Sequence, residues 1–221
     1  KNYGAQPVAF INGTWSGVCG HKFWEMRDPC DWGKIGALVP LAQKKEAQEA
    51  VKVARSAQSR WSELSKDGRL NILQSWLSNL RRGEAHLLDL IISEVAKPRR
   101  EAQAEIDYGL ELLDASIKRI KSETFERPTD KIFLRYRPRG VVVVITPWNN
   151  PFALSISKLA PALAYGNAVV WKPALQAPGV ARLIVDTIVD AGLPANCLNV
   201  VFGDANTARY LLASAGIDAV T

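Results

Sequence analysis

An unbroken run of β-branched residues, Val141–Thr146 (VVVVIT), constrains the fold of this 221-residue chain more than any other feature. A strand of this composition has no polar side, so both of its faces must be buried, as in the middle of a parallel sheet. Ala168–Trp171, Leu198–Phe202 and Ile217–Val220 read as three further strands, each separated from the previous one by room for one helix. This alternation predicts right-handed βαβ units in an α/β fold, a Rossmann-like doubly wound parallel sheet.

Local signals place the helices between these strands. Asn150 and the proline after it suggest a helix cap with proline at the first helical position, and Pro161 should bend or shorten that helix. Pro178 opens the next helix, which ends near Gly192. Asp204 can cap a third helix that runs through Leu212.

The chain before this core divides into three stretches. Asn12-Gly13 is a hairpin turn signal, and the region up to Pro40 suggests short strands and loops. Apolar residues then recur at helical spacing from Gln43, which predicts four amphipathic helices, with Pro98 separating the third from the fourth. Lys131–Arg137 (KIFLRYR) alternates apolar and basic residues, so we expect a half-exposed strand that pairs with a strand of another domain or subunit.

Composition excludes several classes of protein. The net charge is +6, but Lys and Arg are spread over helices that also carry Glu and Asp, which favours a basic surface over a nucleic-acid site. No apolar run reaches the roughly 20 residues of a membrane span. The three cysteines and two histidines show neither a CxxC pair nor metal-ligand spacing, so we expect a reducing, cytoplasmic setting without disulfides or metal. These residues are Cys19, Cys30, Cys197, His21 and His86.

In a doubly wound sheet, ligands bind beyond the carboxyl ends of the strands. The segments there are Pro147–Asn150, Lys172–Leu175 and Gly203–Asn206, and no GxGxxG fingerprint accompanies them. Asn149 can donate an amide N–H to a developing oxyanion, or it can cap the next helix. Lys172 can hold a ribose hydroxyl or a phosphate, or it can be an ordinary exposed lysine at a strand end.

The order of several short motifs decides between these alternatives. Together they resemble the NAD(P)-dependent aldehyde dehydrogenase superfamily over nearly the whole chain, in its N-terminal, cofactor-binding portion. The motifs are INGTW at 11–15, EVAKP at 94–98, TPWN at 146–149, KLAPAL at 158–163, Gly166-Asn167, WKPA at 171–174, AGLP at 191–194, and LNVV at 198–201 followed by Gly203.

The resemblance assigns a role to individual positions. Asn149 matches the oxyanion-hole asparagine, and Lys172 matches the lysine that holds the adenosine ribose or its 2′-phosphate. Lys158 matches a lysine sometimes implicated in proton relay, which can equally be structural. The resemblance implies NAD or NADP as cofactor, and we expect its site to comprise Ile145, Thr146, Pro147, Trp148, Asn149, Lys172, Ala174, Leu175 and Gly203.

The resemblance also divides the chain and leaves part of the reaction outside it. Residues 1–130 would form the N-terminal strand and helix segment of the cofactor-binding domain, 131–138 an oligomerisation-arm strand, and 139–221 the NAD(P)-binding core. The catalytic cysteine and general-base glutamate of the family match nothing here, so we expect them beyond Thr221 and expect the chain alone to be inactive. The family activity is oxidation of an aldehyde to a carboxylic acid, in a homo-oligomer when the protein is complete.

Two departures and two rival interpretations remain. Many NAD-preferring relatives carry Glu three residues after the ribose lysine, where this chain has Leu175, and Asn150 stands where an aromatic residue is common. One rival is a non-catalytic remnant of the family that acts as a binding or interaction module. The other is a nucleic-acid binder, which rests on net charge alone.

Overall fold

The central sheet has the parallel core that the sequence predicts. The computed structural model describes residues 9–16, 22–128 and 132–221. Its six-stranded sheet has the order β10-β7-β8-β9-β1-β2. The parallel strands are β7 (Val141–Ile145), β8 (Ala168–Lys172), β9 (Leu198–Val201) and β10 (Ala219–Val220).

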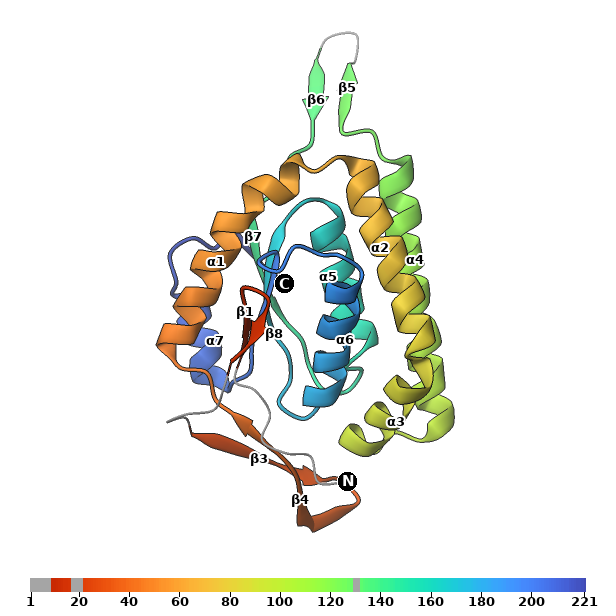
Figure 1. Cartoon of the computed structure of the whole chain (residues 1–221), viewed down its shortest axis with the longest axis vertical. Coiled ribbons are helices and arrows are strands. Elements are labelled where there is room, and N and C mark those ends of the chain that lie inside the picture. The colour runs from red at the N-terminus through yellow and green to blue at the C-terminus, as the bar shows by residue number, and fades with distance from the viewer. Residues whose placement is uncertain (1–8, 17–21, 129–131) are drawn as a thin grey trace.

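Alternate side chains of these strands bury against two different helical layers. Val141, Val143 and Val170 pack into a cluster with the alanine-rich face of α1 (Lys44–Glu63) and with Leu211 of α7 (Ala205–Leu212). The intervening valines belong to a larger cluster with α5 (Ala153–Ala164) and α6 (Pro178–Asp190). Figure 1 shows α1 and α7 on one side of the sheet and α5 and α6 on the other. Burial on both faces explains the absence of polar positions in β7.

Strands from the N-terminal end complete the sheet. β1 (Ala9–Ile11) and β2 (Thr14–Trp15) form a hairpin whose turn residues, Asn12 and Gly13, both have positive φ. The sequence therefore predicted the turn correctly. It did not predict that β1 pairs antiparallel with β9 and so joins the central sheet. A second hairpin follows, β3 (Phe23–Asp28) with β4 (Asp31–Pro40), where short strands and loops were expected.

The four amphipathic helices are confirmed. They are α1, α2 (Lys66–Arg82), α3 (Glu84–Val95) and α4 (Arg99–Ser122), and Pro98 separates the last two. α2 and α4 lie outside α5 and α6, so they form an outer layer on one side of the molecule (Figure 1). Gly109 of α4 permits close approach here, because a Cβ at this position would overlap the fully buried ring of Phe152.

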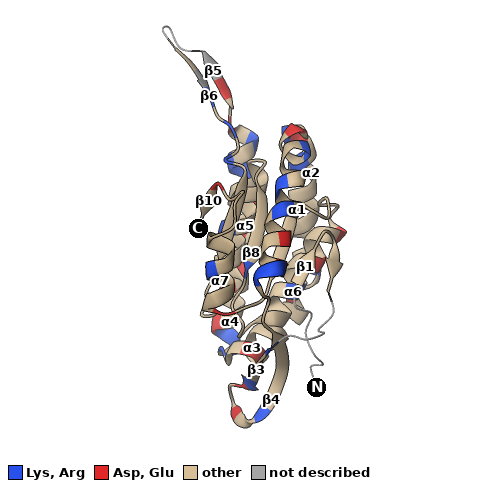
Figure 2. Ribbon diagram, turned by 90° about the vertical axis from the view of Figure 1, so that its left-hand side faces the viewer, with Lys and Arg blue, Asp and Glu red and all other residues tan. Residues whose placement is uncertain are grey.

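The expected arm strand lies in a second small sheet. β6 (Phe133–Arg135) is a strand, and within the chain it pairs with β5 (Glu126–Pro128), a strand that the sequence did not predict; pairing with a strand of another domain or subunit stays a prediction. The resulting hairpin projects from the body of the molecule (Figures 1 and 2). Lys131, the first residue of the expected strand, lies outside the described residues.

The start of α5 corrects a prediction made from the sequence. Asn150 was expected to cap this helix, yet the helix begins at Ala153 with Phe152 in the cap position. The prediction for Asp204 is confirmed, since its carboxylate accepts the backbone N–H groups of Asn206 and Thr207 at the start of α7.

Candidate active site at the carboxyl edge of the sheet

The ends of β7 and β8 are joined at one edge. Ile145 lies opposite Lys172 in the parallel register, and the Thr146 N–H donates to the Lys172 carbonyl over 3.3 Å. The buried Thr146 hydroxyl accepts the Trp171 indole N–H at 2.9 Å and lies 3.3 Å from the Ser155 hydroxyl. The turn after β7 is therefore fixed from beneath, whereas Pro147, Trp148 and Asn149 are exposed.

The structure brings Lys172 and Gly203 together. The Lys172 ammonium donates to the Gly203 carbonyl at 2.7 Å. Burial lowers the pKa of Lys172 by desolvation, and the Asp204 carboxylate partly opposes this shift. An ammonium has three donor hydrogens, so the bond to one carbonyl leaves capacity for a hydroxyl or a phosphate oxygen. Sequence reasoning treated Asp204 only as a helix cap and missed its proximity to Lys172.

Gly203 is required by packing. A Cβ at this position would overlap the side chain of Thr207, whose hydroxyl donates to the Ala42 carbonyl at 2.7 Å. Ala174 and Leu175, which follow the same strand as Lys172, are half-buried, and Leu175 packs against the main core.

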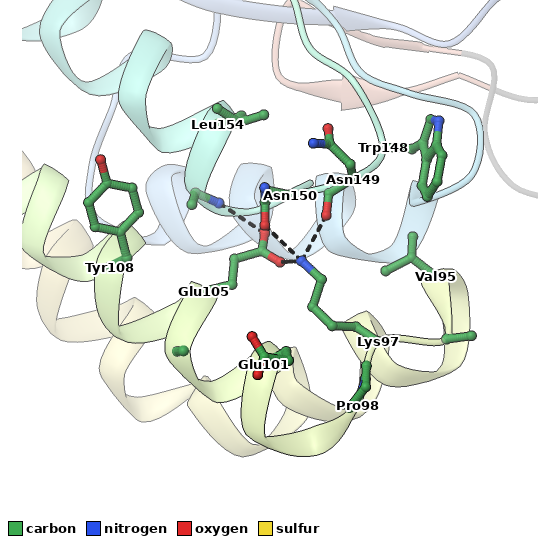
Figure 3. A pocket seen from close by; sticks show the side chains of 13 residues that line it. Val95, Lys97, Pro98, Glu101, Glu105, Tyr108, Trp148, Asn149, Asn150 and Leu154 are labelled. Atoms are coloured by element: carbon green, nitrogen blue, oxygen red, sulfur yellow. Dashed lines mark hydrogen bonds and ion pairs between the residues drawn. The ribbon is translucent and has the colours of Figure 1, made fainter.

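A cavity of about 610 Å³ opens on the other side of the turn after β7 (Figure 3). Asn149 lies in its wall and directs its backbone carbonyl toward Lys97, while its carboxamide lies on the side away from Lys97. Among the described residues, no hydrogen bond occupies that carboxamide, so its N–H is available as a donor. The cavity is lined by residues 95–98, Glu101, Ala104, Glu105, Tyr108, residues 148–150, Ala153 and Leu154.

Two buried glutamates that sequence reasoning did not single out cap the helices at this edge. Glu105 of α4 accepts the N–H groups of Phe152 and Ala153 at 2.8 and 3.2 Å. Glu94 of α3 does the same for α6, accepting from Gly179 at 2.7 Å and Val180 at 3.1 Å. Burial raises the pKa of Glu94 to about 7, although both N–H bonds favour its ionised form. The sequence signal that could have identified them is a glutamate among the apolar positions of a helix, because a glutamate is seldom buried without a partner.

Other candidate residues do not meet at this edge. Lys158 is exposed on α5 and does not line the Asn149 cavity. Cys30 is exposed in the turn between β3 and β4, and Cys197 is buried just before β9, where burial raises the pKa of its thiol to about 12. Cys19 and His21 lie outside the described residues.

Within residues 9–16, 22–128 and 132–221, no three His, Cys, Asp or Glu side chains gather in a way that suits a metal ion. In the same ranges, no helix combines the length and hydrophobicity of a membrane span.

Comparison with known proteins gives a consistent result. The N-succinylglutamate 5-semialdehyde dehydrogenase of Burkholderia mallei (strain SAVP1) is 38% identical over 217 residues, which are 95% of this chain and 43% of that protein. An aldehyde dehydrogenase from Bartonella henselae superposes with a TM-score of 0.93 at 27% identity, covering 98% of this chain and 46% of that one.

A third relative was solved with ligands. Aldehyde dehydrogenase C from Pseudomonas syringae, in complex with NAD⁺ and octanal, superposes with a TM-score of 0.93 at 26% identity, covering 97% of this chain and 44% of that one. The present chain thus spans less than half the length of these relatives. The model of the aldehyde dehydrogenase family matches residues 16–221, and the chain therefore belongs to the aldehyde dehydrogenase family.

Proposed function

We propose that this chain supplies the cofactor site and the oxyanion donor of an enzyme that oxidises a small-molecule aldehyde to a carboxylic acid with NAD or NADP. The proposal rests on the arrangement of residues at the carboxyl edge of the sheet. There, the partly desolvated Lys172 lies next to Gly203, one strand away from the turn that carries Asn149. Ligands of parallel sheets bind at such carboxyl edges. The family relative with bound NAD⁺ and octanal supports the same chemistry.

The residues present suit a dinucleotide. Lys172 retains donor capacity for a ribose hydroxyl or a 2′-phosphate, and the exposed turn of Pro147 and Trp148 offers a surface for the nicotinamide end. When bound, the cofactor accepts the hydride of the reaction. Ile145, Thr146, Ala174 and Leu175 would shape the site, with Thr146 acting through its backbone because its hydroxyl is already hydrogen-bonded beneath the turn.

Asn149 would act on the substrate. When a cysteine thiolate adds to an aldehyde, the carbonyl oxygen becomes an oxyanion. A carboxamide N–H stabilises that charge without titrating. The exposed carboxamide of Asn149 can supply this donor at the wall of the cavity. Lys158 is exposed one turn beyond Leu154 on α5, and both of its expected roles, proton relay and structural, remain predictions.

Cofactor titration tests this proposal. In the full-length protein, Lys172→Met should weaken binding of NAD⁺ and NADP⁺ by about 10- to 100-fold, because a hydrogen bond to a charged donor contributes about 1.5–3 kcal/mol. Lys52→Met is the matched control, since the Lys52 side chain is 80% exposed on α1. Isothermal titration calorimetry gives both constants, and equal affinities for wild type and Lys172→Met would refute the site. Cofactor binding without turnover of any aldehyde would instead favour a non-catalytic binding module.

We expect a preference for NADP, or use of both cofactors, because Leu175 offers no carboxylate to the ribose hydroxyls. A 2′-phosphate next to Lys172 then gains an ion pair, while the carboxylate of Asp204 is engaged by the N–H groups of α7. Leu175→Glu should shift the ratio of kcat/KM values toward NAD by about tenfold or more. Clear preference for NAD in the wild type, unchanged by Leu175→Glu, would contradict this prediction.

We also propose that the β5–β6 hairpin is an oligomerisation arm. Ile132, Phe133 and Tyr136 on this projecting hairpin are 60%, 56% and 53% exposed, and such grouping of exposed apolar side chains is typical of an interaction surface. Ile132→Ser with Phe133→Ser should convert the full-length oligomer to smaller species in light scattering. Trp32→Ser is the control, because Trp32 is 73% exposed on the separate β3–β4 hairpin. An unchanged mass for the double variant would exclude a role of the β5–β6 hairpin in oligomerisation.

Nucleic-acid binding has no comparable support. Figure 2 shows Lys and Arg distributed over the same helices as Asp and Glu. Basic patches that hold phosphate backbones concentrate their charge instead.

A further inference from the structure

A buried ion pair lies directly beneath the turn that carries Asn149. Lys97, in the link between α3 and α4, pairs with Glu105 of α4, and their side chains are 15% and 2% exposed. Figure 3 shows both side chains directed at the start of the segment that leads into α5. Such a pair, taken out of water, requires nearly all of its hydrogen-bonding capacity to be satisfied.

The hydrogen bonds of this pair converge on one short segment. The Lys97 ammonium donates to Glu105, to the Asn149 carbonyl at 2.7 Å and to the Asn150 carboxamide oxygen at 2.8 Å. These three bonds use all donors of an ammonium group. The other oxygen of Glu105 accepts the N–H groups of Phe152 and Ala153. Residues 149–153 are therefore held at four points by two side chains that lie about 50 positions earlier in the sequence.

Helix capping alone does not require this arrangement. A Ser or Thr at the cap position would satisfy the start of α5 locally and without a buried charge. Moreover, a buried ion pair often stabilises a fold no more than apolar residues of similar size do. What the pair adds is directional restraint, and it applies that restraint to the peptide carbonyl of Asn149 itself.

We propose that Lys97 and Glu105 are positioning residues that fix the Asn149 carboxamide for the oxyanion of the reaction. The inference rests on the proposed function of Asn149. An oxyanion donor must be within about 0.5 Å of its productive position, and a misplacement of 1 Å can cost about 100-fold in rate. Lys97 binds the face of the turn opposite the carboxamide (Figure 3), so it would act on the oxyanion through Asn149.

A double-mutant cycle in the full-length protein tests the proposal. Lys97→Met keeps most of the aliphatic stem and removes the three donors. We expect it to lower kcat by tenfold or more, with the KM for aldehyde and the Kd for NAD⁺ changed less than threefold. In an Asn149→Ala background, Lys97→Met should lower kcat little further, because the group that it positions is gone. Lys97→Arg, which restores charged donors, should recover part of kcat.

Lys66→Met is the matched control. The Lys66 ammonium also donates to two backbone carbonyls, those of Lys121 and Glu123, at the far end of α4. It should leave kcat unchanged. If Lys97→Met does not fold, Asn150→Ala removes one of the three Lys97 acceptors without uncovering a buried charge, and should lower kcat about two- to fivefold.

The possible outcomes distinguish a failure of the proposed role of Asn149 from a failure of the positioning role of Lys97 and Glu105. An Asn149→Ala variant with wild-type kcat would overturn the proposed function of Asn149. If Asn149→Ala is impaired but the Lys97 or Asn150 variants keep wild-type kcat, or lower it equally in both backgrounds, the positioning role is overturned. Equal loss in both backgrounds is the result expected of a pair that only stabilises the fold.

Discussion

The purified 221-residue chain is expected to form no NAD(P)H from any aldehyde, because the family's catalytic cysteine matches no residue here and the buried Cys197 cannot reach the Asn149 donor. Thiolate attack requires sulfur about 3 Å from the carbonyl carbon. Cys197 precedes β9, and its carbonyl accepts the Val169 N–H at the amino end of the sheet. Asn149 follows the carboxyl end of β7, a strand length of roughly 17 Å away. Burial also raises the pKa of the Cys197 thiol to about 12, so little thiolate forms near neutral pH.

The measurement is aldehyde-dependent NAD(P)H formation by a sample whose intact mass is confirmed. Cys30 is exposed in the β3–β4 turn and Cys19 lies outside the described residues, so a variant lacking all three cysteines is the necessary control. No turnover by the chain, with activity in the full-length protein, would agree with the expectation. Turnover that is abolished by replacing one of the three cysteines would show that the nucleophile lies within this chain.

In the full-length enzyme, Asn149→Ala is expected to lower kcat by about 100- to 1000-fold, the usual cost of removing one oxyanion donor. The charge that Asn149 would stabilise exists only after attack on the aldehyde, so KM and the Kd for NAD⁺ should change little. Asn149→Asp should be at least as damaging, because it keeps the shape of the side chain but places a carboxylate beside the oxyanion.

Asn71→Ala is the control for this prediction, since Asn71 is exposed on α2, away from the sheet edge. Steady-state kinetics with saturating cofactor separate kcat from KM, and thermal melts check that each variant is folded. A loss confined to KM would mean that Asn149 holds the substrate instead of the oxyanion. A loss smaller than tenfold in kcat would exclude Asn149 as the oxyanion donor of the reaction.

Local sequence determined the order and type of the main elements. Residues close together in the chain specify the β-branched strand β7, the apolar strands after it and the apolar faces of the helices. They also specify the Asn12-Gly13 turn and the Asp204 cap. The order of the short motifs likewise indicates the family without any tertiary information. For Lys172 and Asn149, strand-end position was enough to mark them as candidates, because parallel strands present their carboxyl ends at one edge.

Tertiary structure decided which distant groups meet. Nothing near Phe152 shows that the cap of α5 comes from Glu105, 47 residues earlier, or that Lys97 binds the Asn149 carbonyl. The same holds for β1 joining the sheet beside β9 and for β5 pairing with β6. Hairpin turns, strands and local caps depend on interactions between residues close together in the sequence. A buried charge, by contrast, can be paired by a residue far away in the sequence, and only the packing of the chain determines which residue that is. The sequence by itself therefore determined the scaffold and its edge, and only packing decided how the asparagine at that edge is held.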